Sequence, residues 1–76
     1  MDEGALLHEL GRRIRTQRKQ IGLTQEQLAL VADVDRSYYG AVERGERNVT
    51  FTVLCRLCLA LRCDVALLTN GLPTAR

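Results

Sequence analysis

The sequence is poor in aromatic residues, proline and histidine, and these shortages limit what the chain can be. Two tyrosines, one phenylalanine and no tryptophan are its aromatics, and 76 residues include one proline and one histidine. A hydrophobic fraction of 46% still supplies a core and excludes an intrinsically disordered chain. The length suits one domain, so we expect residues 1–76 to form a single domain with a core over about residues 6–70 and no separate sensor or catalytic domain.

The chain also lacks the motifs that catalysis and cofactor binding usually require. It has no glycine-rich phosphate loop and no nucleophile beside a base in a known motif, and its one histidine is His8. We therefore predict that it is not an enzyme, needs no cofactor and binds no small-molecule ligand. It has no hydrophobic leader and no apolar run of about 18 residues, which predicts a cytoplasmic location and no membrane contact.

Cysteine is present in an odd number, as Cys55, Cys58 and Cys63. An odd count without a leader does not predict a disulfide framework, and it fits a reducing cytosol. A structural zinc site needs four ligands, and the nearest candidate for the fourth, His8, is far away in the sequence. We interpret the cysteines as small apolar residues and predict no metal site.

Helix start and stop signals divide the chain into five short helices. Apolar residues recur every three or four positions from Leu7 to Ile21, and Gly22 ends this first helix of residues 6–21, because glycine takes the left-handed cap conformation without strain. The next four helices start after residues that cap a helix N-terminus. These caps are Thr24, Asp35, Thr50 and Asp64, and the helices end near Ala32, Arg44, Arg62 and Asn70. No segment alternates convincingly with a period of two, so we predict an all-α fold.

The second and third helices form a candidate helix-turn-helix. Thr24 and Gln27 can form a capping box at the start of the second helix, which ends at Ala32. About three residues separate it from the third helix, which starts at Arg36, and so short a connection forces a sharp bend. Short helical corners also occur in proteins that do not bind DNA, so the spacing alone does not decide the function.

Three stretches of sequence give the chain a more specific resemblance. They are LGRRIR at residues 10–15, RKQIGLTQEQLA at 18–29 and VERGERN at 42–48. Together they resemble the phage repressor and Cro type of helix-turn-helix domain, over roughly residues 10–68. The short chain and the stretches at residues 35–38 and 43–48 further resemble the controller proteins of restriction-modification systems. The chain departs from the family pattern with Asp33 and Arg62 where glycine is usual and Val49 where proline is common.

The resemblance implies a lambda-repressor-like DNA-binding domain and a transcriptional regulator. Controllers of this kind are dimers that bind operators upstream of their own gene and the endonuclease gene. The resemblance therefore implies that this chain binds a palindromic double-stranded DNA operator as a homodimer, in the cytoplasm and associated with the nucleoid. Two alternatives stay open, a phage-type repressor or antitoxin and, from another class, a protein-interaction module that uses the fourth helix. RNA polymerase is a further candidate partner, because Glu26 could contact it, but Glu26 could equally be a surface acid near the helix dipole.

We expect the exposed N-terminal residues of the third helix to contact the bases, because a recognition helix places this end in the major groove. Arg36, Ser37 and Tyr38 occupy this end. An arginine there can bond guanine O6 and N7 at once, which is worth about 1 to 3 kcal/mol of discrimination. A plain surface charge is the alternative role of Arg36, and Tyr38 could instead contact a phosphate or cover the helix.

Phosphate contacts are expected at two places beside that helix. Thr24 and Gln25 stand at the start of the second helix, where free N–H groups and the positive end of the dipole favour an anion. Arg47 and Asn48 lie in the loop that follows the third helix. The net charge of +2 does not by itself indicate a polyanion, but five basic residues and no acid lie between residues 12 and 19.

Arg18 is predicted to stabilise the fold instead of contacting DNA. It lies on the apolar stripe of the first helix, between Ile14 and Ile21, and a buried guanidinium needs a carboxylate. Glu43 is its natural partner, because it lies four residues after Tyr39, which we assign to the core. The resemblance also implies a salt bridge between Arg18 and Glu43.

The fourth helix predicts a dimer surface. Arg56 is its only polar residue between residues 53 and 61, so the helix is apolar nearly all round, and one core cannot cover every face. A second apolar patch on so small a domain favours contact with another subunit. The residues assigned to this interface are Phe51, Cys55, Leu59, Val65 and Leu68.

Overall fold

The computed structural model of the chain describes residues 1–74, and over that range it contains five α-helices and no strand. They are α1 (Glu3–Gln20), α2 (Gln25–Ala32), α3 (Arg36–Glu43), α4 (Phe51–Leu61) and α5 (Val65–Thr69). The all-α class predicted from the sequence is confirmed. The first helix begins three residues earlier than the apolar periodicity predicts, because Asp2 caps it by accepting a hydrogen bond from Ala5 N at 2.7 Å.

Every helix begins at a side chain that accepts a hydrogen bond from the backbone of its first turn. Thr24, Asp35, Thr50 and Asp64 cap the four later helices, as the sequence predicts. Each cap satisfies one N–H group that a helix leaves without a backbone partner. The local sequence therefore determines where the helices start.

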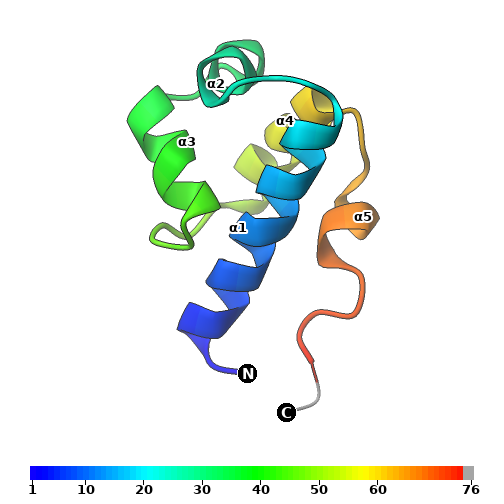
Figure 1. Cartoon of the computed structure of the whole chain (residues 1–76). Coiled ribbons are helices and arrows are strands. Elements are labelled where there is room, and N and C mark those ends of the chain that lie inside the picture. Colours follow the sequence, from blue (N-terminus) through cyan, green and yellow to red (C-terminus); the bar gives the residue numbers. More distant parts are fainter. Residues whose placement is uncertain (75–76) are drawn as a thin grey trace.

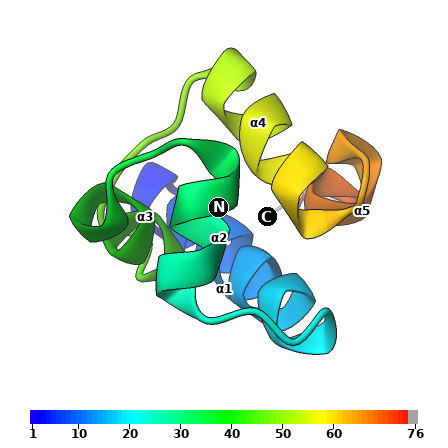
Figure 2. The same cartoon turned by 90° about the horizontal axis from the view of Figure 1, so that it is seen from above.

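The long helix α1 lies at the centre of the fold, with α3 on one side and α5 on the other (Figure 1). The short helix α2 contacts both α3 and α4. Seen from above, α4 and α5 lie together, and α2 separates them from α3 (Figure 2). This arrangement leaves the start of α3 on the surface.

All five helices contribute to one core. Its largest fully buried side chains are Ile14 from α1, Leu28 from α2, Tyr39 from α3, Leu57 and Leu61 from α4, and Leu68 from α5. A core shared in this way fixes the orientation of α2 relative to α3, and therefore the surface that the two helices present.

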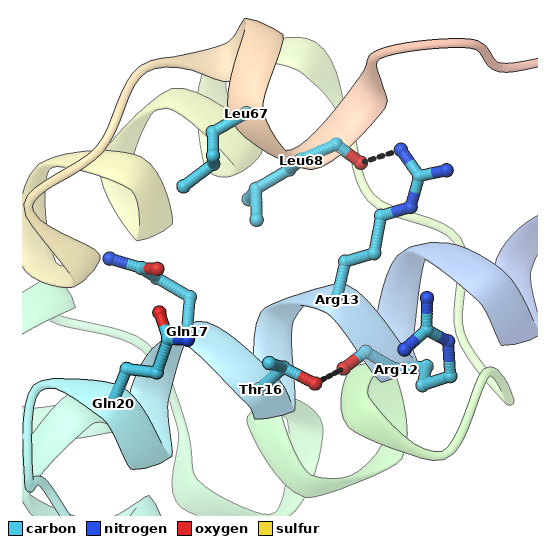
Figure 3. Close-up of a pocket in the computed structure, with 7 residues that line it drawn as sticks. All are labelled: Arg12, Arg13, Thr16, Gln17, Gln20, Leu67 and Leu68. Atoms are coloured by element: carbon cyan, nitrogen blue, oxygen red, sulfur yellow. Dashed lines mark hydrogen bonds between the residues drawn. The ribbon is translucent and has the colours of Figure 1, made fainter.

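Polar side chains of α1 hold the C-terminal part of the chain in place. The Arg13 guanidinium donates to the carbonyl oxygen of Leu68 at 3.2 Å (Figure 3). It also donates to the carbonyl oxygen of Asn70 at 2.7 Å. Gln17 donates to the Leu61 carbonyl oxygen at 3.0 Å, at the end of α4. An open pocket of about 220 Å³ remains between α1 and α5 beside these contacts. Arg13 and Gln17 thus satisfy carbonyl groups at the ends of α4 and α5.

Candidate nucleic-acid interface

The turn between α2 and α3 has the sharp geometry of a helix-turn-helix. Asp33 adopts the left-handed conformation, with φ 58° and ψ 49°, which aspartate tolerates better than most residues. Val34 N donates to the Ala29 carbonyl oxygen at 3.0 Å, and the Val34 side chain packs against the core. Aspartate therefore serves at the position where the family usually has glycine.

Arg56 fixes this turn from the neighbouring helix α4. Its guanidinium donates to the carbonyl oxygen of Ala32 at 3.2 Å and also bonds the carbonyl oxygen of Asp33. These groups are left without helical partners where α2 ends. Sequence reasoning did not assign this role, although a single arginine within an apolar helix was the available signal.

The three predicted base-reading residues occupy the first turn of α3. Arg36 and Ser37 are exposed, and Tyr38 is half-buried against the core. Arg36 Nε lies 3.3 Å from a carboxylate oxygen of Glu26, so the guanidinium is held over the start of α2. This contact connects the two helices and was not predicted.

Tyr38, Arg47 and Asn48 form one cluster beside the exposed face of α3. The Tyr38 hydroxyl donates to the Asn48 carbonyl oxygen at 3.2 Å. The Arg47 guanidinium carbon lies 5.1 Å from the centroid of the Tyr38 ring, which is a cation–π distance. The structure thus brings a predicted base-reading residue together with both predicted phosphate contacts of the loop.

Thr24 and Gln25 lie at the start of α2, and both already have partners within the protein. Thr24 belongs to a complete capping box with Gln27, with bonds of 2.8 and 3.1 Å. Gln25 donates through Nε2 to Glu43 Oε1 at 2.9 Å. Because a primary amide carries two N–H donors, Gln25 can still offer one outward.

The side chains of Arg18 and Glu43 meet in the interior, between α1 and α3. Arg18 donates to both Glu43 carboxylate oxygens, at 2.6 and 3.1 Å, and to the Leu23 carbonyl oxygen at 2.9 Å. With Gln25 bound to the same carboxylate, Glu43 links α1, α2 and α3. The ion pair therefore positions the start of α2 against α3.

The surroundings of Arg18 and Glu43 favour the charged form of each side chain. Burial raises the pKa of Glu43, but hydrogen bonds from Arg18 and Gln25 outweigh it, so the pKa lies below its ordinary value. The hydrogen bond to Glu43 raises the pKa of Arg18. Burial, with the Glu43 carboxylate nearby, raises the pKa of Tyr39. Both partners of the ion pair are therefore charged at neutral pH.

Four of the five residues assigned to the dimer surface are at least partly accessible. Phe51 and Leu59 are 69% and 81% exposed, and Cys55 and Val65 are half-buried. The assignment of Leu68 is wrong, because Leu68 is 1% exposed and its side chain fills the core between α1 and α4. The short helix α5 turns Leu67 outward instead, with 54% of its surface exposed.

The cysteines differ in burial, and the described residues contain neither a metal-ligand cluster nor a membrane-spanning helix. Cys58 is buried, and Cys55 and Cys63 are half-buried. No group of three potential metal ligands comes together within residues 1–74. In the same range, no helix combines the length and hydropathy needed to cross a membrane.

Comparison with known proteins gives consistent matches. The profile of the family described as helix-turn-helix matches residues 14–68. Control protein C.SmaI from Serratia marcescens is 45% identical over 56 residues, which cover 74% of this chain and 67% of that protein. The crystal structure of the restriction-modification controller protein C.AhdI from Aeromonas hydrophila is similar with a TM-score of 0.82 and 44% identity, over 84% of this chain and 97% of that chain.

A further solved structure is that of the restriction-modification controller protein C.Esp1396I, determined as a tetramer in complex with its natural 35 base-pair operator. It is similar to this chain with a TM-score of 0.77 and 32% identity, over 83% of each chain.

Proposed function

The chain belongs to the helix-turn-helix family and, within it, to the controller proteins of restriction-modification systems, and on this basis we propose that it is a transcriptional regulator that binds a palindromic DNA operator as a homodimer. The proposal places the protein in the cytoplasm and assigns it no catalytic step. The family consists of DNA-binding regulators, and we propose which residues of this chain contact the DNA.

The observation that carries the proposal is the position of Arg36 at the exposed start of α3. Within residues 1–74, the Arg36 guanidinium is anchored by one exposed carboxylate, that of Glu26, so it is free to turn toward a guanine. Tyr38 lies in the same first turn of α3, and the Arg47 guanidinium lies over its ring, which adds an aromatic ring and a second cation to this part of the surface. We propose that Arg36, Ser37 and Tyr38 read bases and that Arg47 and Asn48 contact phosphates.

A second phosphate contact is proposed at the start of α2. The capping box of Thr24 orients the first turn, and the backbone N–H groups there favour an anion. Gln25 is held by Glu43 in a fixed position, with one amide hydrogen left to donate. The buried ion pair of Arg18 and Glu43 thus supports the proposed DNA contacts without taking part in them.

Dimerisation is supported by the apolar stripe on α4. Phe51, Cys55 and Leu59 recur every four residues on one face of the helix, away from the core. A symmetric dimer through this face would carry two copies of α3, which suits a palindromic site. The tetramer of C.Esp1396I on its operator is a precedent for oligomeric binding.

RNA polymerase is proposed as a further partner through Glu26. When Arg36 turns toward DNA, its present carboxylate partner is left on the surface of α2, where 72% of that side chain is exposed. The replacement Glu26→Gln is expected to lower activated transcription in a purified system while leaving operator affinity unchanged. A loss of operator affinity would instead show that Glu26 acts by orienting Arg36.

The central test is selection of bound fragments from random double-stranded DNA. We expect a two-fold symmetric consensus with guanine at the positions that face Arg36. The variant Arg36→Ala should relax the preference at those positions, at a cost of about 1 to 3 kcal/mol per contact. Arg12→Ala is the matched control, because Arg12 is an exposed arginine on α1 that lines the pocket beside α5.

A second measurement separates phosphate contacts from base contacts. Arg47→Ala should weaken binding to all sequences alike and reduce the log–log salt slope by about 0.9. If the chain does not bind DNA even at low salt, the proposal of a transcriptional regulator is refuted. The alternative function, a protein-interaction module, would then remain. A consensus that does not change in Arg36→Ala would overturn the role of Arg36.

A further inference from the structure

The C-terminal cap of α4 brings two cysteines together. Arg62 ends the helix in the left-handed conformation, with φ 60°, and the next residue, Cys63, donates its N–H to the Cys58 carbonyl oxygen at 3.0 Å. This is the long-range bond of a Schellman motif, in which the side chains at these two positions frequently pack against each other. Such a contact is usually between apolar residues, and here both residues are cysteine.

The thiols of Cys58 and Cys63 differ in exposure. The Cys58 side chain is buried, and the Cys63 side chain is half-buried, so one thiol is closed to solvent and the other is reachable. Cys55, one turn earlier on α4, lies on the stripe assigned to the dimer surface and is also half-buried.

We propose that Cys58 and Cys63 form a redox-active dithiol that closes into an intramolecular disulfide across the end of α4, with a low-molecular-weight disulfide such as glutathione disulfide as the oxidant. This inference goes beyond the proposed function and does not depend on DNA binding. It rests on the geometry of the cap, because the backbone bond from Cys63 to Cys58 puts these residues at the two positions whose side chains commonly meet in a Schellman motif.

The exposure of the two thiols assigns the order of the reaction. The Cys63 thiolate attacks one sulfur of the small disulfide, which forms a mixed disulfide and releases one small thiolate. The Cys58 thiol then loses its proton to solvent, and its sulfur attacks Cys63 and expels the second small thiolate. Two protein thiols are oxidised and one small disulfide is reduced. Burial raises the pKa of Cys58 to about 12, and burial also raises that of Cys63, so closure is expected to be slow unless oxidant is abundant.

Closure would join the last turn of α4 to the chain that enters α5. Asp64 caps α5 immediately after Cys63, and Val65 follows on the surface assigned to dimerisation. The disulfide would therefore restrain the junction of α4 and α5 next to that surface. The ordering cost is small, because the Schellman bond already restrains the four residues between Cys58 and Cys63.

The sequence makes this proposal directly testable by peptide mapping. Trypsin cuts after Arg47, Arg56 and Arg62, so the cysteines fall on three different peptides, residues 48–56, 57–62 and 63–76. The folded, reduced, full-length chain is incubated with glutathione disulfide, its free thiols are alkylated, and the digest is analysed by mass spectrometry. We expect a disulfide between the peptides 57–62 and 63–76, with alkylated Cys55 on peptide 48–56, in chains that remain monomeric on a denaturing non-reducing gel.

Single variants distinguish this pair from adventitious oxidation. Cys55→Ser should still form the cross-link, and Cys63→Ser should lose it while keeping its helical circular dichroism. Should Cys63→Ser fail to fold, Cys58→Ala supplies the same comparison. A cross-link that includes peptide 48–56, links only between chains, or glutathione adducts without any cross-link would each overturn the proposal.

Discussion

At the residue scale, Arg36 combines a defined orientation with a low cost of release. Arg36 Nε is held 3.3 Å from a Glu26 carboxylate oxygen, and the side chains of Arg36 and Glu26 are 43% and 72% exposed. An exposed ion pair contributes about 0 to 1 kcal/mol, whereas a bidentate contact to guanine is worth about 1 to 3 kcal/mol of discrimination. The guanidinium therefore stays between the exposed starts of α2 and α3 in the free protein, and in the proposed complex it exchanges a weak partner for a stronger one.

Replacing Arg18 should lower the stability of the fold, because we assign this residue a structural role and no DNA contact. In Arg18→Ala, the Glu43 carboxylate loses two hydrogen bonds and remains buried without its counter-charge. Breaking one side of a buried pair costs about 3 to 5 kcal/mol, a large share of the stability of a chain of this size. We expect a lower melting temperature in circular dichroism at 222 nm, a standard helix signal.

The control for this variant is Arg15→Ala, which removes an exposed arginine from the same helix. It should leave the melting temperature almost unchanged. If Arg18→Ala melts like the wild type but loses operator affinity, Arg18 contacts DNA and its structural role is refuted.

Stability should fall in acid because the pKa values of three glutamates, Glu9, Glu26 and Glu43, lie below their ordinary value. Hydrogen bonds from Arg12 and Arg13 lower the pKa of Glu9 from 4.5 to about 2, and the hydrogen bonds that Glu43 accepts lower its pKa despite burial. A group with a lowered pKa stabilises the fold above its unfolded pKa, and this stability is lost as the pH falls through the folded pKa. The melting temperature should therefore decline as the pH falls from 4.5 toward about 2.

The contribution of Glu9 can be isolated with Glu9→Gln. The wild type should melt above this variant at neutral pH, and the difference should shrink as the pH approaches about 2, where Glu9 becomes protonated. A difference that stays constant over the whole range would show that the Glu9 carboxylate does not stabilise the folded chain.

At the element scale, the contact between α1 and α3 depends on one glycine. A Cβ atom on Gly11 would overlap the backbone carbonyl oxygens of Val42 and Glu43, which cannot move without shifting α3. We expect Gly11→Ala to destabilise the fold by about 1 to 3 kcal/mol, although alanine is the better helix former. Thermal unfolding followed by circular dichroism measures this change.

Gly40→Ala is the matched comparison, because Gly40 is also a buried helical glycine. Its added Cβ would lie 2.6 Å from Nη1 of Arg36, the far end of a flexible side chain that can move aside. We expect no loss of stability, and a gain of up to about 1 kcal/mol from helix propensity. Operator affinity should fall in this variant, because Arg36 is displaced. Equal destabilisation by both substitutions would contradict this account of the α1–α3 contact.

Helix boundaries were largely predictable because they depend on neighbouring residues. Thr24, Asp35, Thr50 and Asp64 cap the helices that the sequence predicts. The turn at Asp33 was also readable, since its left-handed conformation is a property of one residue and its neighbours. The start of α1 was placed too late, because apolar periodicity does not register the cap at Asp2.

Contacts between distant elements were predictable only where a residue was conspicuous. Arg18 stood out as a charge on an apolar stripe, which made its pairing with Glu43 inferable. The bonds of Arg56 to the end of α2 and of Arg36 to Glu26 depend on how the helices cross, which no local pattern encodes. Leu68 was misplaced for the same reason, because the rotation of the five-residue helix α5 decides which leucine faces inward.

At the scale of the whole molecule, the proposed DNA contacts and the apolar stripe lie on different helices. The former lie on α2, α3 and the loop after α3, and the latter follows α4. The domain extends 35 Å in its longest dimension, and a dimer bound to successive half-sites must space its recognition helices by about 34 Å. Two subunits of this size can therefore place their copies of α3 in adjacent major grooves. The dimer interface then determines the distance between the two copies and hence the spacing of the half-sites.

The dimer surface can be tested with two leucines that differ in position but not in exposure. Leu59 on α4 is 81% exposed and Leu30 on α2 is 82% exposed, so an aspartate at either site should leave the fold intact. Leu59→Asp would place a charge within the apolar interface and should weaken dimerisation by about 2 kcal/mol or more, roughly thirtyfold in Kd. Leu30→Asp should remain dimeric. Sedimentation equilibrium measures both, and operator affinity should fall only in Leu59→Asp, because a monomer holds one half-site with one α3. If both variants dimerise with equal affinity, α4 does not form the dimer interface. If only Leu30→Asp dissociates, the interface lies on α2 instead.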